Sequence, residues 1–414
     1  MQIPIFRGGG CMTIIFLQNI FEKSINGEWG NEDSGKGDAT AVIRTSNFLN
    51  SGRLNLDNIV CREIDKDKNS GKILRTGDII IEKSGGSPNQ PVGRVVYFDV
   101  TDQDYFTNNF TSILRVKPGY NSKYIFYLMK YLYDTKKVLK FQNQTTGIIN
   151  LKLADYLNKT KVNIETIENQ NTIVSILDRL EYQIINRNKQ LSELSNLVKS
   201  RFNEMFGDPI LNDMGWEVTK LGELTNKISS GNTPKGGSQV YVDKGIMFFR
   251  SQNVWKNKIL LDDIAYIDDQ TNRNMKDTIL EHGDLLITKT GRVNTENSSL
   301  GRTAQYLGQS GKANINGHVY LVRINSDISK RFILEILISN AYRDYIRRIC
   351  VGGIDKRQLN KNHIEDFPII LPPLSLQNEF ADFVDQVDKS QLAIQKSLEE
   401  LETLKKSLMQ EYFG

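Results

Sequence analysis

The sequence repeats itself. Shifted by about 207 residues, the second half of the chain aligns with the first along nearly its whole length. Residues 170–207 lie over 377–414 without a gap and are identical at 13 of 38 positions, and 76–85 match 282–291 after a small drift in register. A repeat of this length is a duplicated domain, because solenoid units have only about 20–50 residues. Two copies in one chain predict an approximate internal two-fold axis, which suits a target with two halves.

Composition narrows the class of protein. The chain has 414 residues, 39% hydrophobic and 25% charged, which is typical of a globular protein with at least two domains. It has no apolar run of about 18 residues, and the run at 14–17 is too short for the core of a signal peptide, so we expect a cytoplasmic protein without a membrane span. Cys11, Cys61 and Cys350 are too widely spaced for a disulfide framework or a zinc cluster. The net charge of +4 is compatible with a polyanionic partner.

Each copy ends in a segment with heptad spacing of apolar residues. The first seam consists of Ile173, Leu177, Leu180, Ile184, Leu191 and Leu194. The second consists of Phe380, Val384, Val387, Ile394, Leu398 and Leu401. One such helix could simply pack on its own domain, but two matched seams favour an antiparallel pair. About 36 helical residues would span roughly 54 Å, more than the roughly 34 Å of one DNA turn.

The globular portions, 13–165 and 215–372, alternate short apolar runs with turn signals, which predicts mixed α/β domains. The expected strands lie at 41–44, 78–81, 93–97, 246–249, 284–287 and 318–322. One helix is expected in each portion, beginning at the N-cap residues Ser122 and Ser329.

Polar residues recur where the expected strands end. Arg44, Thr45 and Asn47 correspond to the set Arg250, Ser251 and Asn253. Arginine and asparagine can each bond two atoms of a base edge, so these residues are candidates for reading DNA bases. The alternative is that the asparagines organise a turn.

A second recurring set places cations in glycine-containing loops. Its members are Lys83, Ser84 and Arg94 in the first copy and Lys289, Thr290, Arg292 and Arg302 in the second. Such residues could bind phosphate, or the glycines could merely permit a hairpin with positive φ. The loops 145–148 and 351–354, the latter followed by Lys356 and Arg357, are further candidates.

Catalytic motifs are absent. The sequence has no P-loop, no HExxH, no nucleophile elbow and no dinucleotide-binding glycine motif. Asp78, Glu82 and Lys83 could form a nuclease site, but Thr288 replaces Glu82 in the second copy. The sequence therefore predicts a protein that binds and positions a target, with no catalytic residues and no metal site.

These features together resemble the specificity subunit of type I restriction-modification enzymes. The resemblance lies in the Gly-Asp strands at 77–81 and 283–287, the segments 221–234 and 371–377, and the two terminal helices. It implies two target-recognition domains in pseudo-two-fold arrangement, separated by a long antiparallel two-helix coiled coil and reading a bipartite, asymmetric double-stranded DNA target. It also implies two modification (methyltransferase) subunits docked on the helices and restriction/translocase subunits. S-adenosylmethionine and ATP with Mg would then belong to those partner subunits.

On this basis the expected domains are a leader or atypical start at 1–12, recognition domains at 13–165 and 208–372, and spacer helices at 166–207 and 373–414. Met12 is a candidate for the native start. Two alternatives stay open. One is an enzyme acting on nucleic acid through Asp78, Glu82 and Lys83, and the other is a coiled-coil adaptor that never touches DNA.

Overall fold

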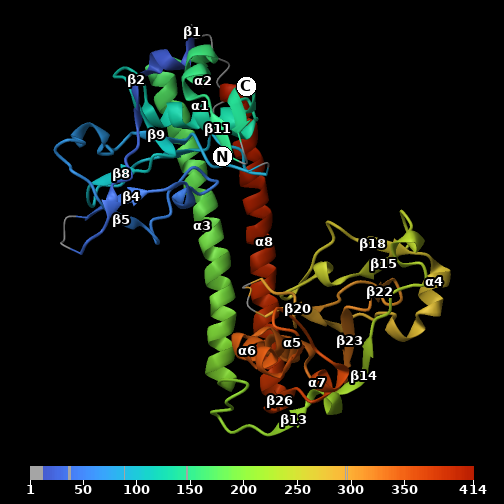
Figure 1. The fold of residues 1–414 in the computed structure, drawn as a ribbon. Helices are drawn as coiled ribbons and strands as arrows, with labels where there is room; N and C mark the ends of the chain where they lie inside the picture. The colour runs from blue at the N-terminus through green and yellow to red at the C-terminus, as the bar shows by residue number, and fades with distance from the viewer. Residues whose placement is uncertain (1–12, 36–38, 88, 146–147, 294, 296) are drawn as a thin grey trace. The chain divides into compact units, whose positions relative to one another are not determined.

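The computed structural model describes residues 13–35, 39–87, 89–145, 148–293, 295 and 297–414, so the expected leader at 1–12 lies outside the described residues. The chain divides into two compact units. One comprises the described residues up to Asn188 together with Lys396–Gly414, and the other comprises Lys189–Gln395. Each unit therefore contains one globular portion and a part of both long helices (Figure 1). Within the described ranges, no helix has the length and apolar content that crossing a membrane requires.

The first unit is built on a four-stranded antiparallel sheet in the order β2-β9-β6-β7. A second sheet has the order β3-β5-β4-β8, with β4 and β8 parallel, and two further pairs are β1-β12 and β10-β11. The strands are β1 (Thr13–Phe16), β2 (Phe21–Asn26), β3 (Asn31–Glu32), β4 (Ala39–Ile43), β5 (Val60–Glu63), β6 (Ile79–Glu82), β7 (Val95–Tyr97), β8 (Tyr105–Thr107), β9 (Thr111–Val116), β10 (Gln142–Thr145), β11 (Ile148–Leu151) and β12 (Lys161–Ile164). The helices are α1 (Ser122–Asp134), α2 (Leu153–Lys159) and the start of α3 (Ile167–Phe206).

The second unit has the same plan. Its four-stranded sheet has the order β14-β23-β19-β21, and β18-β15-β22 forms a second sheet whose β15 and β22 are parallel. The pair β13-β26, the pair β16-β17 and the sheet β20-β25-β24 complete the unit. The strands are β13 (Val218–Lys220), β14 (Thr225–Ser230), β15 (Ile246–Phe249), β16 (Val254–Trp255), β17 (Lys258–Ile259), β18 (Ala265–Ile267), β19 (Leu285–Thr288), β20 (Thr290–Arg292), β21 (Thr303–Gln305), β22 (Ala313–Ile315), β23 (Val319–Ile324), β24 (Val351–Gly352), β25 (Lys356–Gln358) and β26 (Pro368–Ile370). The helices are α4 (Asp269–Asn274), α5 (Lys330–Ile338), α6 (Asn340–Ile349), α7 (Lys361–Glu365) and the start of α8 (Leu374–Phe413).

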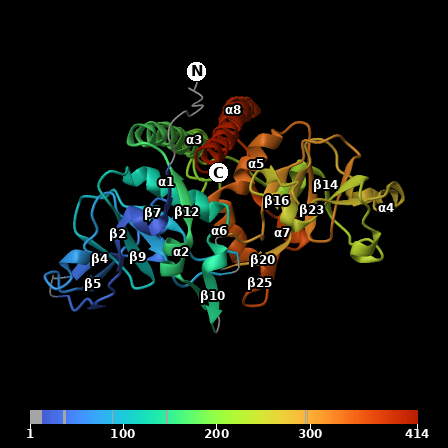
Figure 2. The same cartoon turned by 90° about the horizontal axis from the view of Figure 1, so that it is seen from above.

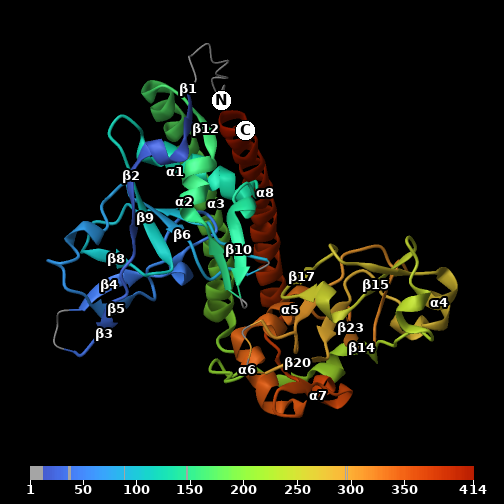
Figure 3. The same ribbon diagram turned by 45° about the horizontal axis from the view of Figure 1, so that its top comes forward.

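Matching strand orders confirm the internal duplication. β6 and β19 occupy the same place between corresponding neighbours, and all six strands expected from the sequence are present within a residue or two of their expected bounds. In the second unit β15, β18 and α4 lie remote from α8, whereas α5 lies against it (Figures 1 and 3).

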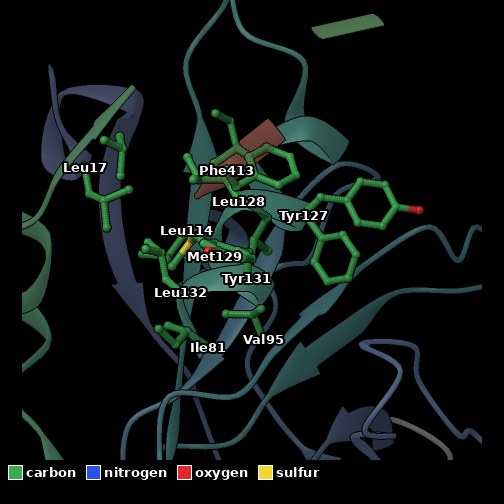
Figure 4. Close-up of a cluster of buried hydrophobic side chains, with 14 of the residues drawn as sticks. Leu17, Ile81, Val95, Leu114, Tyr127, Leu128, Met129, Tyr131, Leu132 and Phe413 are labelled. Atoms are coloured by element: carbon green, nitrogen blue, oxygen red, sulfur yellow. The ribbon is translucent and has the colours of Figure 1, made fainter. Parts of the chain in front are cut away.

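The central sheet of each unit is buried on both faces. Ile79 and Ile81 of β6 join a cluster with α1, whereas Ile80 points to the opposite face and joins Val96 and Ile113. Figure 4 shows Ile81 close to the α1 side chains. In β19, Leu285 and Ile287 face the helices and Leu286 faces away from them. Burial on both faces explains why these strands are continuous apolar runs instead of alternating patterns.

The helix beginnings differ from expectation in one copy. Asn121, not Ser122, caps α1, and its side chain accepts hydrogen bonds from the backbone N–H groups of Lys123 and Tyr124. The prediction of Ser122 as the N-cap is therefore wrong by one residue. Asparagine and serine are comparably good N-caps, so the sequence did not distinguish between them. Ser329 does cap α5, as predicted.

The expectation of one helix in each portion is wrong in both copies, because α2 follows α1 in the first and α4, α6 and α7 accompany α5 in the second. An extended residue, Ser339, ends α5 and caps a second helix, α6, through a hydrogen bond from the Tyr342 N–H.

The two long helices are each 40 residues, and they pack inside both units. In the first unit the start of α3 shares a cluster with the end of α8, and Glu181 pairs with Lys405. In the second unit the end of α3 packs on the start of α8. There Ser195 contacts Gln391, whereas Arg201 pairs with Glu379, so the two segments run in opposite directions.

Candidate nucleic-acid interface

The strand end at Arg44 is a folded turn. The backbone N–H of Arg44 donates to Asn47 Oδ1 at 2.9 Å, and Asn47 Nδ2 donates to the Asn55 carbonyl at 3.0 Å. Asn47 is 3% exposed. The Arg44 guanidinium donates to the Asn58 carbonyl at 3.1 Å.

The second copy repeats this turn. The Arg250 N–H donates to Asn253 Oδ1 at 2.9 Å, and Asn253 Nδ2 donates to the carbonyls of Leu260 and Asp263. Arg250 also pairs with the Asp263 carboxylate at 3.0 Å. Hydrogen bonds from Gln252 and Arg250 lower the pKa of that carboxyl. Asn47 and Asn253 thus organise turns and are not free to read bases, which corrects the base-reading expectation in favour of its alternative. Thr45 and Ser251 lie half-buried in the same turns.

Arg94 is not a phosphate ligand either. Its guanidinium makes a bidentate pair with Glu82 at 2.8 and 3.0 Å and donates to the Thr45 carbonyl at 3.1 Å. The two side chains are only 12% and 4% exposed. The pair links β6 to the strand-end turn, so the expectation of a phosphate contact at Arg94 is wrong.

Arg302 occupies the matching position, and no acidic side chain of the described residues pairs with it. Thr288 accepts from the Arg302 N–H at 2.8 Å, and the guanidinium donates to the Ser298 carbonyl and lies 3.8 Å from the centroid of the Trp255 ring. Burial lowers the pKa of Arg302. The difference between Glu82 and Thr288 is therefore a change in how a half-buried arginine is held. Unlike Arg94, Arg302 contacts neutral groups, so a phosphate contact at Arg302 stays a prediction.

A buried ion pair, which the sequence did not reveal, explains the recurring Gly-Asp motif. Asp78 accepts two bonds from Arg115 at 2.9 Å, and Asp284 accepts two from Arg323 at 2.8 Å. Each aspartate is at most 2% exposed, and its hydrogen bonds raise the pKa of the arginine. The preceding glycines have φ of 95° and 93°, which favours glycine. The sequence contained one signal for this ion pair, because an arginine recurs at equivalent positions of β9 and β23.

These pairs also bear on the nuclease alternative. Asp78 and Glu82 are each buried and each bonded to an arginine. They join different arginines, so they do not form an open carboxylate pair that could hold a reacting group.

The loop lysines are held differently. Lys83 Nζ donates to Asn26 Oδ1 at 2.7 Å, and Lys289 Nζ lies 3.5 Å from Ser230 Oγ, so each reaches across one strand to the end of β2 or β14. Burial lowers the pKa of Lys83. Ser84 donates to Asn150 Oδ1 at 2.6 Å. Because both lysines contact neutral oxygens, their charge is left for an anionic ligand.

The hairpin β24–β25 is the most exposed part of the candidate set. Ile354 at its tip is 92% exposed, Lys356 is exposed and Arg357 is half-buried. Arg292 pairs with Asp355 at 3.3 Å in solvent, and the half-buried Thr290 lies on β20, beside β25. In the first unit β10 extends away from the body (Figure 2), and part of the expected loop 145–148 lies outside the described residues.

The seam residues expected to bind partners are largely internal. Those that are 0–6% exposed are Ile173, Leu177, Leu180, Phe380, Val384, Val387 and Leu398. They pack within the chain, so they cannot contact another subunit, and the partner-binding expectation is wrong for them. Ile184, Leu191, Leu194, Ile394 and Leu401 are half-buried. The large apolar side chains that do face solvent include Tyr182 (65%) on α3 and Leu392 (72%) on α8.

Comparison with known proteins adds independent findings. A family model described as "Type I restriction modification DNA specificity domain" matches residues 12–196 and 214–404. The chain is 23% identical over 397 residues to the type I restriction enzyme StySPI specificity subunit of Salmonella potsdam, covering 91% of this chain and 82% of that protein. It is 25% identical over 200 residues to the putative type I restriction enzyme MjaX specificity subunit of Methanocaldococcus jannaschii, covering 48% of this chain but only 45% of that protein.

Solved structures show the same fold. The S subunit of a type I restriction-modification system from M. genitalium aligns with a TM-score of 0.59 at 14% identity, covering 99% of this chain and 98% of that one.

Proposed function

The chain belongs to the type I restriction modification DNA specificity family, and we propose that it is the non-catalytic subunit that gives a type I restriction-modification complex its DNA target. The observation that carries the proposal is the double match of the family model, which falls on the two copies of one strand order. A protein with two copies of one recognition fold reads a target with two halves. Because the globular portions have diverged more than the helices, the halves differ in sequence and the target is asymmetric.

DNA contact in this proposal rests on the cations whose charge is not neutralised by a buried acid. Lys83 and Lys289 contact neutral oxygens, and Lys356 is exposed on a hairpin. Lysines of this kind bind phosphates and position a protein on DNA, whereas sequence is read by other contacts in the grooves.

The long helices act as the spacer. We propose that α3 and α8 pair along their length as an antiparallel coiled coil and thereby set the gap between the half-sites. Opposite chain directions in the second unit, together with the ion pair between Glu181 and Lys405 in the first, support this arrangement.

Partner subunits supply the chemistry. Two modification subunits would methylate adenine with S-adenosylmethionine, and restriction/translocase subunits would use ATP and Mg, all in the cytoplasm. The solvent-facing Tyr182 and Leu392 are candidate docking positions on the helices, in place of the buried seam residues.

Reconstitution tests the proposal. The chain is purified alone and with its modification subunits, and transfer of labelled methyl groups to genomic DNA is measured. We expect sequence-specific methylation only when both components are present. DNA cleavage by the chain alone with a divalent metal, lost in Glu82→Ala, would establish the enzyme alternative instead. The adaptor alternative predicts that the chain alone binds no DNA, whereas phosphate contacts predict weak binding that decreases steeply as salt rises.

A further inference from the structure

Two buried glutamines occupy the same place in the two units. Gln170 is the fourth residue of α3 and Gln377 is the fourth residue of α8. Each is 2% exposed. Both follow directly on the last strand pair of a recognition domain, β1-β12 or β13-β26.

In the first unit the amide of Gln170 uses both of its ends. Its Oε1 accepts a hydrogen bond at 2.8 Å from the backbone N–H of Asn121, which is the N-cap of α1. Its Nε2 donates at 2.8 Å to the carbonyl of Glu165, just before α3 begins.

The second unit contains the same arrangement. Gln377 Oε1 accepts at 3.2 Å from the backbone N–H of Ser329, which is the N-cap of α5. Gln377 Nε2 donates at 2.8 Å to the carbonyl of Pro372, just before α8 begins. One side chain thus joins the first turn of a long helix, the segment that enters it and the N-cap of a recognition-domain helix, α1 or α5.

Apolar packing alone would not require an amide here. A methionine has similar volume, and burying an amide is unfavourable unless its hydrogen bonds are made. Apolar contacts tolerate sliding, whereas a hydrogen bond weakens steeply as its angle departs from linear. An amide bonded at both ends therefore fixes the orientation of the domain on the helix.

We propose that Gln170 and Gln377 are positioning residues that lock each recognition domain to its spacer helix and so restrict the complex to one gap between half-sites. This proposal rests on the proposed function. Adding one base pair to the gap moves a half-site by roughly 3.4 Å and turns it by roughly 35° about the DNA axis. A locked domain cannot follow that change, whereas a domain released from its glutamine can reorient toward it.

The test uses the complex with its modification subunits. Gln170→Met and Gln377→Met are made singly, because one released domain is enough to relax the gap. Substrates are the mapped target and versions with the gap one base pair shorter or longer. For each variant we expect methylation of the altered gaps relative to the native gap to rise roughly fivefold, as expected for losing about one net hydrogen bond. The half-site bases should stay the same.

Two control variants separate positioning from stability. Gln386→Met makes the same substitution at an exposed position of α8, and Ile346→Val weakens the core of the second unit on α6, a helix to which Gln377 makes neither of its two hydrogen bonds. Neither should change the gap ratio. Amide hydrogen exchange at Ser329 should accelerate in Gln377→Met and not in either control.

The outcomes are distinguishable. Unchanged gap ratios in both glutamine variants, alongside an active and gap-selective wild type, would overturn the positioning proposal. A rise of the same size in Ile346→Val would overturn it as well, because general loosening would then explain the effect. A wild-type complex that methylates no target at any gap would instead count against the proposed function.

Discussion

At the residue scale, the location of each charge separates folding from DNA binding. Asp284 and Arg323 are bonded to one another in the interior, whereas Lys356 and the pair Arg292–Asp355 lie in solvent. Removing one member of a buried ion pair costs roughly 3–5 kcal/mol, because the remaining charge is left without compensation. Exposed pairs contribute at most about 1 kcal/mol. Substitution of the buried charges should therefore change stability, whereas substitution of the exposed charges should change DNA binding.

The buried pair predicts a stability effect. Asp284→Asn should lower the free energy of unfolding of the second unit by roughly 2–3 kcal/mol, because the half-buried Arg323 then keeps only Glu281, a partner that is 57% exposed. Urea unfolding measures this. Asp355→Asn is the matched control in solvent and should change stability by less than about 1 kcal/mol. Equal losses in the two variants would contradict the assignment of Asp284 as a structural residue.

The exposed hairpin predicts a binding effect. Lys356→Ala should weaken DNA binding of the assembled complex at all sequences and reduce the slope of log affinity against log salt by about 1, without changing the melting temperature. Affinity is measured between low and moderate salt. Lys396→Ala on the exposed face of α8 is the control and should leave the slope unchanged. An unaltered slope in Lys356→Ala would show that this hairpin does not touch phosphate.

Glu335 predicts a pH effect. It lies on α5, 10% exposed and 3.0 Å from Arg331, and burial raises its pKa to about 6 from an ordinary value of 4.5. The folded state therefore holds its proton at a pH where the unfolded state has lost it. Stability is favoured below pH 4.5 and declines as pH rises toward 6, by about 2 kcal/mol in total.

Comparison with Glu335→Gln isolates the contribution of Glu335 to the pH dependence of stability. The free energy of unfolding of the wild type minus that of Glu335→Gln should fall by about 2 kcal/mol between roughly pH 3.5 and pH 7, with the steepest change between pH 4.5 and pH 6, and then level off. Urea unfolding at several pH values gives the difference. A difference that rises with pH would mean that the ion pair to Arg331 outweighs burial.

At the scale of elements, periodic patterns could be predicted from the sequence, and pairing partners could not. The heptad seams predicted both long helices, and the apolar runs predicted the strands, because burial repeats along each element. The role of Asp78 stayed hidden because Arg115 lies 37 positions away on another strand, and sequence spacing does not reveal register. The arginine–asparagine motif indicated a repeated structure correctly, but the sequence could not decide between a turn and a base contact. Capping at Asn121 was missed because the adjacent Ser122 is equally suitable.

The spacer role predicts a change in the DNA target. Deleting seven residues from the middle of each long helix, 187–193 and 393–399, keeps the apolar seam in register and shortens the pair by roughly 10 Å. The preferred gap should shrink by about three base pairs. Methylation of a series of targets with different gaps measures this. Deletion from α3 alone breaks the match between the seams and should abolish assembly. An unchanged gap in the double deletion would show that the helices do not set the spacing.

At the scale of the whole molecule, each unit is completed by the far end of a helix. At the end of α8, the ring centroid of Phe413 lies 5.1 Å from that of Tyr124 in the first unit. At the end of α3, the ring centroid of Phe206 lies 4.8 Å from that of Phe332 in the second. The first recognition domain thus packs on the start of α3 and the end of α8. The second packs on the start of α8 and the end of α3. This repeated plan allows the domains to diverge while the helices that hold them stay alike.

Domain exchange follows from that plan. Replacing residues 13–165 by the corresponding portion of a relative with a different target should change one half-site and leave the other half-site and the gap intact. Methylation sites of the hybrid and of both parents are compared. A change in both half-sites would contradict independent reading by the two domains.

The most direct test is to map methylated adenines in the DNA of cells that contain this chain and its modification subunits. We expect one motif made of two different short half-sites separated by a gap of fixed length, and its disappearance when the chain is removed. A single uninterrupted motif, or methylation that persists without the chain, would contradict the claim that its two domains supply the target.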